Sequence, residues 1–466
     1  MKAYARKKSQ SSSPVVPAVS APVLASEEPP SIVPPDVSSP MYPLEFDDAV
    51  LLGYVKTTPR RTIGFHQQPA DPIATQEPVL YDGPHLLTCA PTGEGKGRCS
   101  AIPTLLEYPG QVVAIDVKGE LYDCTHRKRR EMGQQVIKLD PFHVIGGQTD
   151  GFNPLDMFKL SSADADTDSQ MMASMLAEGN KFGRDPFWDN TACGLNSGVI
   201  NYLMTRLPAD KQNLNEMRRL LNNDDVVTNL AIMLDRDGKN LRELAYQEIA
   251  AFLQLSERDT RPGVLATAQA YTKALNSERV SKMLEKSSFD LQQFADGKPM
   301  SIYIIIPPER LESHRALLRI TLAALFAAVF SRRKMPNPRT LFLVDEAGNL
   351  GSFPMMKAAM TLARGYGVRV WSFWQDMQQL TDCYPTCWKS IINNAGALQL
   401  FGLNTKLMAR DWADVLGCST EELLALKPNE QMLQLRGRGD LRCERLDYLV
   451  DPRYVGGFDD NRFYSR

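Results

Sequence analysis

Two groups of residues have the types and spacing needed to bind and hydrolyse a nucleotide. The first is the run Ala90-Pro91-Thr92-Gly93-Glu94-Gly95-Lys96-Gly97, which lies between an apolar segment and a helical pattern. Glycines let backbone N–H groups turn inward onto phosphate oxygens at a helix N-terminus, and Lys96 can reach the β and γ phosphates of ATP. The candidate nucleotide-binding residues are therefore Thr92, Gly93, Glu94, Gly95, Lys96, Gly97 and Arg98. The alternative is a Gly-rich turn that binds no ligand.

This phosphate-binding loop departs from the common pattern at two positions. Ala90 stands where the first glycine is usual, and Gly97 stands where a Ser or Thr usually gives Mg²⁺ a hydroxyl ligand. We expect Mg²⁺ to be held through water, by Thr92, or by groups elsewhere in the chain.

The second group is a pair of carboxylates, Asp345 and Glu346, which directly follow the apolar run 341–344. Acids at the end of a buried strand are costly unless they are used. In such a site Asp345 would hold the Mg²⁺ shell and Glu346 would polarise the attacking water. A strand capped by two solvated acids is the alternative. Gln375 follows the run 368–373 and Trp374, where it either senses the γ phosphate or is only a polar strand end.

An arginine from a neighbouring subunit commonly neutralises the transition state of such enzymes. Arg364 is the candidate, because it lies between the helix expected after Glu346 and the strand that leads to Gln375. Arg369 is the second choice. An arginine that offsets the dipole at a helix C-terminus explains Arg364 equally well.

Two further clusters allow a functional and a plain interpretation. Asp116, Lys118 and Glu120 follow another strand, where an acid could order Mg²⁺-bound water or belong to a solvated turn. The basic residues 127–130 with Lys138 could line a DNA channel, although a solvated helix face is the favoured interpretation.

The elements that must position these residues follow an α/β pattern. Short apolar runs at 86–89, 112–116, 302–306, 341–344 and 368–373 alternate with helical segments, which predicts a mostly parallel sheet. Between Asp156 and Gly297 the strand signal gives way to amphipathic stretches at 194–207, 214–221 and 264–284. Residues 431–435 and 443–450 flank a Gly-rich turn and predict a hairpin that closes the edge of the sheet.

These patterns divide the chain into three parts. Residues 1–45 are rich in Ser and Pro and predict a disordered tail. Residues 46–157 and 297–466 form the predicted P-loop nucleotide-binding domain, with an inserted all-α domain at 158–296 that would recognise cargo.

Composition excludes several other classes of protein. Hydrophobic residues make up 43% of the chain and the net charge is -2, which is ordinary for a globular protein. The eight cysteines form no CxxC pair, so we expect a reduced compartment and no structural zinc. The longest apolar stretch, 320–330, is about half the length of a membrane span, so it predicts a buried helix and no transmembrane anchor.

With these motifs in order, the chain resembles the type IV secretion coupling proteins, which are conjugative DNA-transfer ATPases. The resemblance covers about residues 80–450 and rests on APTGEGKG (90–97), IPTLL (102–106), DVKGE (116–120), FNPLD (152–156), DPFW (185–188), IPPERLESH (306–314), LVDEAGNLG (343–351) and WQDMQQL (374–380). It implies a RecA-like hexameric motor whose helical domain handles cargo, and it accommodates Gly97. The N-terminal pair of membrane helices usual in that family has no counterpart in this sequence.

We therefore expect an ATPase that uses ATP and Mg²⁺ to deliver single-stranded DNA, a relaxase-DNA complex or another protein to a type IV secretion channel. Adaptor proteins and a homo-hexamer are the other expected partners, at a cytoplasmic location peripheral to the inner membrane. Two alternatives stay open: a recruitment receptor with little turnover, and a DNA packaging or segregation translocase. Intact Lys96, Asp345 and Glu346 disfavour the first, and FNPLD and DPFW disfavour the second.

Overall fold

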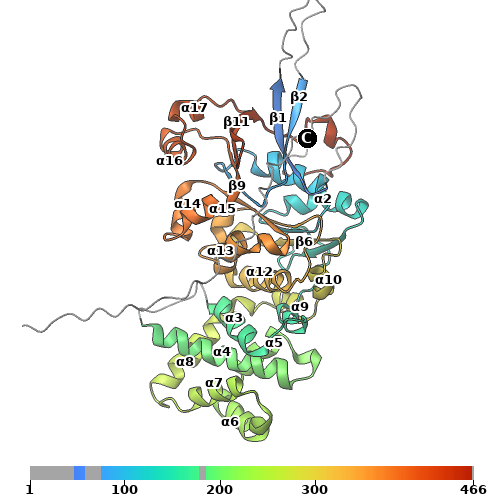
Figure 1. Ribbon diagram of the computed structural model, residues 1–466. Helices are drawn as coiled ribbons and strands as arrows, with labels where there is room; N and C mark the ends of the chain where they lie inside the picture. Colours follow the sequence, from blue (N-terminus) through green and yellow to red (C-terminus); the bar gives the residue numbers. More distant parts are fainter. Residues whose placement is uncertain (1–46, 58–74, 178–184, 464–466) are drawn as a thin grey trace, which may run out of the picture. The chain divides into compact units, whose positions relative to one another are not determined.

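The computed structural model describes residues 47–57, 75–177 and 185–463 of the chain (Figure 1). The predicted tail at 1–45 lies outside these residues. The strands are β1 (Val50–Thr57), β2 (Thr75–Tyr81), β3 (His85–Cys89), β4 (Val112–Asp116), β5 (Gln135–Leu139), β6 (Met300–Ile305), β7 (Thr340–Val344), β8 (Val368–Trp374), β9 (Ala395–Leu400), β10 (Glu430–Leu435) and β11 (Gly439–Glu444).

The α-helices fall into two groups. Those outside the segment between β5 and β6 are α1 (Ile102–Glu107), α2 (Glu120–Glu131), α11 (Pro308–Leu311), α12 (Arg315–Phe330), α13 (Pro354–Leu362), α14 (Met377–Cys383), α15 (Trp388–Asn394), α16 (Lys406–Leu416) and α17 (Thr420–Leu424). Those between β5 and β6 are α3 (Ala165–Ala177), α4 (Pro186–Arg206), α5 (Leu214–Leu221), α6 (Val226–Asp237), α7 (Glu243–Leu253), α8 (Thr260–Tyr271), α9 (Glu278–Glu285) and α10 (Leu291–Ala295).

The strands of the described part form one 11-stranded sheet in the order β2-β1-β11-β10-β9-β3-β8-β7-β4-β6-β5. From β9 to β5 every neighbouring pair is parallel. The five apolar runs predicted as strands form β3, β4, β6, β7 and β8, which confirms the mostly parallel α/β sheet. Parallel strands place their carboxyl ends at one edge, where ligands of such sheets bind.

The predicted hairpin exists as the antiparallel pair β10 and β11, but two details of the prediction are wrong. The second strand ends at Glu444, and the side chain of the next residue, Arg445, donates a hydrogen bond from Nη1 to the Glu94 carbonyl oxygen at 2.7 Å. The hairpin also does not close the sheet. β11 pairs with β1 at Tyr54, and β1 pairs with β2, so the backbone groups on the outer side of β11 have a partner strand.

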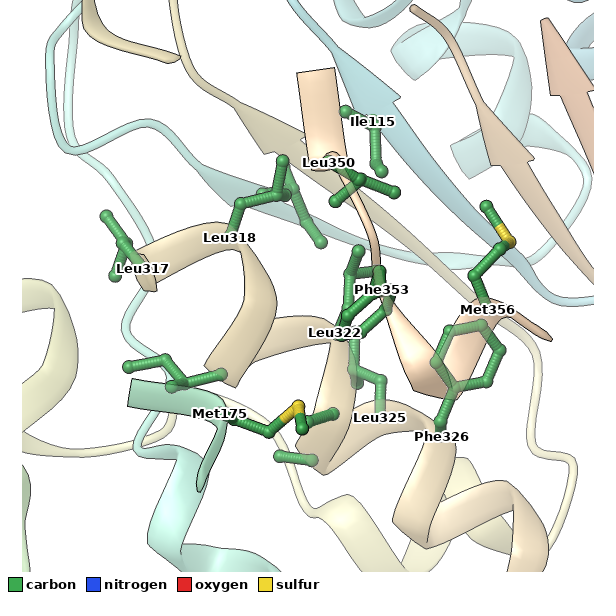
Figure 2. Packing of buried hydrophobic residues seen from close by; sticks show 14 of the residues in the cluster. Ile115, Met175, Leu317, Leu318, Leu322, Leu325, Phe326, Leu350, Phe353 and Met356 are labelled. Atoms are coloured by element: carbon green, nitrogen blue, oxygen red, sulfur yellow. The ribbon is translucent and has the colours of Figure 1, made fainter. Parts of the chain in front are cut away.

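Helices cover both faces of the sheet, which explains the continuous apolar runs in its strands. Val112 and Ala114 of β4 pack with residues of α1 and α2, whereas Val113 and Ile115 belong to the core that contains α12. This second core continues into the helices between β5 and β6. Figure 2 shows Leu318, Leu322 and Leu325 of α12 among Ile115 of the sheet, Leu350 of the loop after β7, and Met175 of α3.

Helices α3 to α10 occupy the segment in which the sequence predicts helices. The stretch 264–284, predicted as one helical run, is divided between α8 and α9 by a turn at 272–277. The apolar residues 320–330 lie in α12, a helix that is buried over most of its length, as predicted. Within the described ranges, no helix has both the length and the apolar character that a membrane span requires. The division into an ATPase domain and a cargo domain stays a prediction.

The solvated face favoured for the basic residues 127–130 is confirmed only in part, because Arg130 is exposed and Arg127 and Lys128 are half-buried. Arg129 is fully buried, and its guanidinium donates to the Gly110 carbonyl oxygen at 2.6 Å and to Ser301 Oγ at 2.8 Å. Arg127 Nε donates to Asp459 Oδ1 at 2.7 Å. Arg129 therefore joins α2 to the sheet and cannot line a DNA channel.

Candidate nucleotide site

The phosphate-binding loop joins β3 to a short π-helical turn at Gly97–Ala101, so backbone N–H groups lie at a helix start above the sheet edge. Gly93 (φ 88°) and Gly95 (φ 83°) have left-handed backbone conformations that suit glycine. A Cβ atom on Gly93 or Gly97 would meet no atom within 4 Å, so the outer side of the loop has room for a ligand. The loop thus fits a phosphate chain.

Lys96 immediately precedes the helical turn and is 7% exposed. Its Nζ donates to the carbonyl oxygens of Ala90 at 2.8 Å and Pro91 at 3.4 Å, and it lies 3.6 Å from Glu346 Oε1. The ammonium group is therefore held at the loop by partners that phosphate oxygens can replace.

The two carboxylates follow β7, and Gln375 follows the neighbouring strand β8. Gln375 Nε2 donates to Glu346 Oε2 at 2.8 Å, and the backbone N–H of Glu346 donates to Asp345 Oδ1 at 3.1 Å. Lys96, Glu346 and Gln375 thus form one connected chain of contacts. Glu346 has a φ of 53°, a left-handed conformation that costs a non-glycine residue about 1–3 kcal/mol and tends to occur at functional sites.

Asp116 at the end of β4 adds a third acid to this edge, since β4 lies beside β7. It is 1% exposed and accepts a hydrogen bond at Oδ2 from the Tyr122 backbone N–H at 2.8 Å. Burial raises the pKa of Asp116 to about 7, and burial together with the Glu346 carboxylate raises the pKa of Asp345 to about 7. A bound cation would stabilise the charged form of carboxylates that are buried in this way.

A pocket joins these groups at the carboxyl ends of the strands. Its lining consists of Pro91, Thr92, Gly93, Gly95, Lys96, Gly97, Arg98, Asp116, Val117, Lys118, Glu120, Leu121, Asp345 and Glu346. No group of three metal-ligating side chains is found among the described residues. A magnesium ion here would therefore rely on Asp345, water and phosphate oxygens, which are the hard oxygen ligands that Mg²⁺ prefers.

Two of the predicted nucleotide-binding residues, Arg98 and Glu94, bond to other parts of the protein and so hold the phosphate-binding loop in place. Arg98 Nε donates to Asp447 Oδ1 at 2.6 Å, and its Nη2 pairs with the other carboxylate oxygen. Glu94 does not line the pocket, and its Oε1 accepts a hydrogen bond from Asn404 Nδ2 at 2.8 Å. Asp447 and Asn404 could not be predicted as partners of this loop, because they lie far along the chain and match no local motif.

Arg364 does not join this site. It is exposed in the short 3₁₀ turn Ala363–Tyr366, which precedes β8 and so lies at the amino ends of the strands, opposite the pocket. The second choice for an arginine that reaches a neighbouring site, Arg369, is wrong, because its guanidinium is buried. It donates to the Gly83 carbonyl oxygen at 2.9 Å and lies 3.5 Å from Asp48 Oδ2.

Comparison with known proteins shows which chains are similar in sequence. The family model described as type IV secretory system conjugative DNA transfer matches residues 54–423. The conjugal transfer protein TraG of Escherichia coli is 26% identical over 320 residues, which are 65% of this chain and 50% of TraG. The type IV secretion system-coupling protein VirD4 of Bartonella quintana (strain Toulouse) is 22% identical over 430 residues, 82% of this chain and 65% of VirD4. The chain spans about half the length of the first of these relatives.

Solved structures show the same fold at low sequence identity. The plasmid coupling protein TrwB in complex with the non-hydrolysable GTP analogue GDPNP aligns with a TM-score of 0.59 at 16% identity, over 81% of this chain and 88% of TrwB. TrwB in complex with ADP and Mg²⁺ aligns with a TM-score of 0.57 at 15% identity, over 81% of this chain and 88% of that chain. These likenesses establish the RecA-like P-loop fold predicted from the resemblance.

Proposed function

The chain belongs to the type IV secretory system conjugative DNA transfer family, and from this membership we propose that it is a coupling ATPase that delivers cargo to a secretion channel. The observation that carries the proposal is the contact chain from Lys96 through Glu346 to Gln375, beside Asp345. These residues converge from three adjacent loops although about 280 positions separate the first from the last.

The geometry supports the following proposed roles in ATP hydrolysis. Lys96 exchanges its two loop carbonyl partners for oxygens of the β and γ phosphates. Asp345 would hold Mg²⁺, which when bound would supply positive charge against the developing negative charge on the phosphates. Glu346 accepts a proton from the attacking water, while Gln375 Nε2 fixes the orientation of that carboxylate.

Arg364 enters this scheme only through a second copy of the chain. The nucleotide pocket of the same subunit lies at the opposite edge of the sheet from Arg364. Arg364 would therefore reach the γ phosphate bound to a neighbouring subunit. We propose a homo-hexameric ring with shared sites, in agreement with the expectation from the sequence.

The proposed cargo is single-stranded DNA, alone or with a covalently attached relaxase, and the helices between β5 and β6 are the proposed cargo and adaptor domain. We place the protein in the cytoplasm, at the inner membrane through the secretion channel components.

The test is ATPase activity of the purified chain with and without single-stranded DNA. A motor is expected to turn over ATP and to do so faster when DNA is added, because translocation consumes ATP. A recruitment receptor would bind ATP with little turnover under either condition, and that result would overturn the proposal.

A further inference from the structure

Three loops meet at the amino ends of the strands, opposite the ATP pocket. We call residues 296–298, 331–336 and 362–367 the amino-edge loops. Arg332 joins them, since its guanidinium donates to the carbonyl oxygens of Ala295 at 2.7 Å, Tyr366 at 3.3 Å and Gly367 at 3.4 Å. Burial lowers the pKa of Arg332 to about 10, and its remaining contacts include Thr340 Oγ1 at 2.8 Å. The loops are therefore fixed to one another and to the sheet.

Cations dominate the exposed side of the amino-edge loops. Lys298, Arg333, Lys334 and Arg364 are all exposed, against one exposed carboxylate, Asp296. In the part of the chain that the structure describes, the side chains of these four cations have no hydrogen bond or ion pair, whereas Asp296 Oδ1 accepts one from Gln292 Nε2 at 2.9 Å. Unpaired cations gathered on rigid loops form a site for an anionic polymer.

The positive charges at this edge also affect a buried group, His85. His85 begins β3 near the same edge, and its pKa is lowered to about 4. Burial is the largest cause, followed by the positive charges of Arg369, Arg339, Arg364 and Arg436. Two of these arginines already face a carboxylate, because Arg339 and Arg369 lie 3.0 and 3.5 Å from Asp48 Oδ2. Arg364 has no such carboxylate partner among the described residues, and its charge adds to the positive potential of this edge.

Apolar and aromatic side chains lie among the exposed cations. Tyr366 is 37% exposed, Met335 55% and Leu362 69%. The Tyr366 ring is supported from within by Phe330, at a centroid distance of 5.4 Å in an edge-on arrangement. A supported aromatic ring beside phosphate-binding cations is the combination that single-stranded nucleic acids require, because their bases are free to stack. An acidic peptide would use the cations but not the ring.

We propose that the amino-edge loops bind single-stranded nucleic acid, with phosphates on Lys298, Arg333 and Lys334 and a base stacked on Tyr366. The identity of this cargo rests on the proposed function, whereas the location rests on the loops alone. ATP and the nucleic acid would then contact opposite ends of the same β-strands. The sheet and α12, which run between the two ends, would connect hydrolysis to movement of the strand.

The test is binding of a fluorescein-labelled 30-nucleotide poly-dT strand to the full chain, measured by anisotropy from 50 to 200 mM salt. The double variant Arg333→Glu/Lys334→Glu is expected to bind at least about tenfold more weakly at 50 mM, and its salt slope should fall by about 1.4, for two lost contacts. Tyr366→Ala should weaken binding about fivefold or more. The control variant Arg410→Glu/Lys427→Glu makes the same charge change at exposed sites outside both the amino-edge loops and the proposed cargo domain, and it should bind like the wild type.

The outcomes separate this inference from the proposed function. No binding by the wild type would overturn both the nucleic-acid cargo and this surface. Binding by the wild type with equal binding by the Arg333 and Lys334 variant would overturn the surface alone. A variant that loses poly-glutamate but keeps poly-dT would identify an acidic protein partner instead. Equal affinity for duplex DNA, with no effect of Tyr366→Ala, would rule out single-strand recognition. Unchanged basal ATPase activity and thermal melting in each variant would show that folding is intact.

Discussion

Asp116→Asn should stabilise the nucleotide-free protein, and more so as the pH rises. Burial raises the pKa of Asp116 from its ordinary 3.8 to about 7, so the folded chain holds this proton more tightly than the unfolded chain does. The contribution of Asp116 to stability is therefore fully present below pH 3.8 and is lost as the pH rises through 7. At about 1.4 kcal/mol for each pKa unit, the charged carboxylate costs the folded protein up to about 4 kcal/mol above pH 7.

Asparagine carries no proton to lose and keeps an oxygen that can accept from Tyr122. The difference in unfolding free energy between Asp116→Asn and the wild type should therefore grow by about 3 kcal/mol between pH 5 and pH 8. Any constant effect of the substitution cancels in this comparison of two pH values. If Asp116 also orders Mg²⁺-bound water, the more stable variant should be the slower ATPase.

The assay is urea unfolding with EDTA at pH 5, 6, 7 and 8. Asp224→Asn, at an exposed carboxylate between α5 and α6, is the control and should change the free energy by about 0.5 kcal/mol or less. A difference in unfolding free energy that is independent of pH, or that shrinks as the pH rises, would contradict this account of Asp116 as a buried carboxylate that destabilises the protein when no cation is bound.

Three further predictions follow from the fold. Gly119→Ala should destabilise the protein by more than Gly133→Ala. Both glycines have a φ near 80°, but only a Cβ on Gly119 would meet another side chain, that of Ile145, at 2.2 Å. Equal melting temperatures of the two variants would contradict this. Mixing Arg364→Ala with Glu346→Gln subunits, each inactive alone, should restore part of the ATPase activity, and near-normal turnover by Arg364→Ala alone would remove it from the catalytic residues. The segment 158–296 should fold alone, since α4 packs on α3, α7 and α8; a noncooperative melt by circular dichroism would show that it depends on α12.

The sequence predicted the parts of the fold that leave a local pattern. The strands that carry the phosphate-binding loop, Asp345 and Gln375 are short apolar runs covered on both faces, and such runs are recognisable without a structure. β1, β2, β5 and β9 escaped prediction. β5 begins with exposed or half-buried residues, and β9 (AGALQL) contains small and polar residues that carry little strand signal.

Contacts between distant parts of the chain could not be predicted in the same way. Gln375 bonds Glu346 only because β8 pairs with β7, and Arg98 meets Asp447 only because the chain turns after β11. Nothing in the local sequence distinguishes Arg369, which is buried against Asp48, from Arg364, which is exposed a few residues earlier. Tertiary pairing decided each of these outcomes.

The central claim is that Lys96 binds phosphate and Glu346 activates water in one ATPase site. It is tested most directly by measuring ATP affinity and turnover in Lys96→Ala and Glu346→Gln. We predict that Lys96→Ala loses ATP binding, whereas Glu346→Gln binds ATP like the wild type and loses turnover by at least about a hundredfold. Wild-type ATP affinity in Lys96→Ala, or wild-type turnover in Glu346→Gln, would contradict the account.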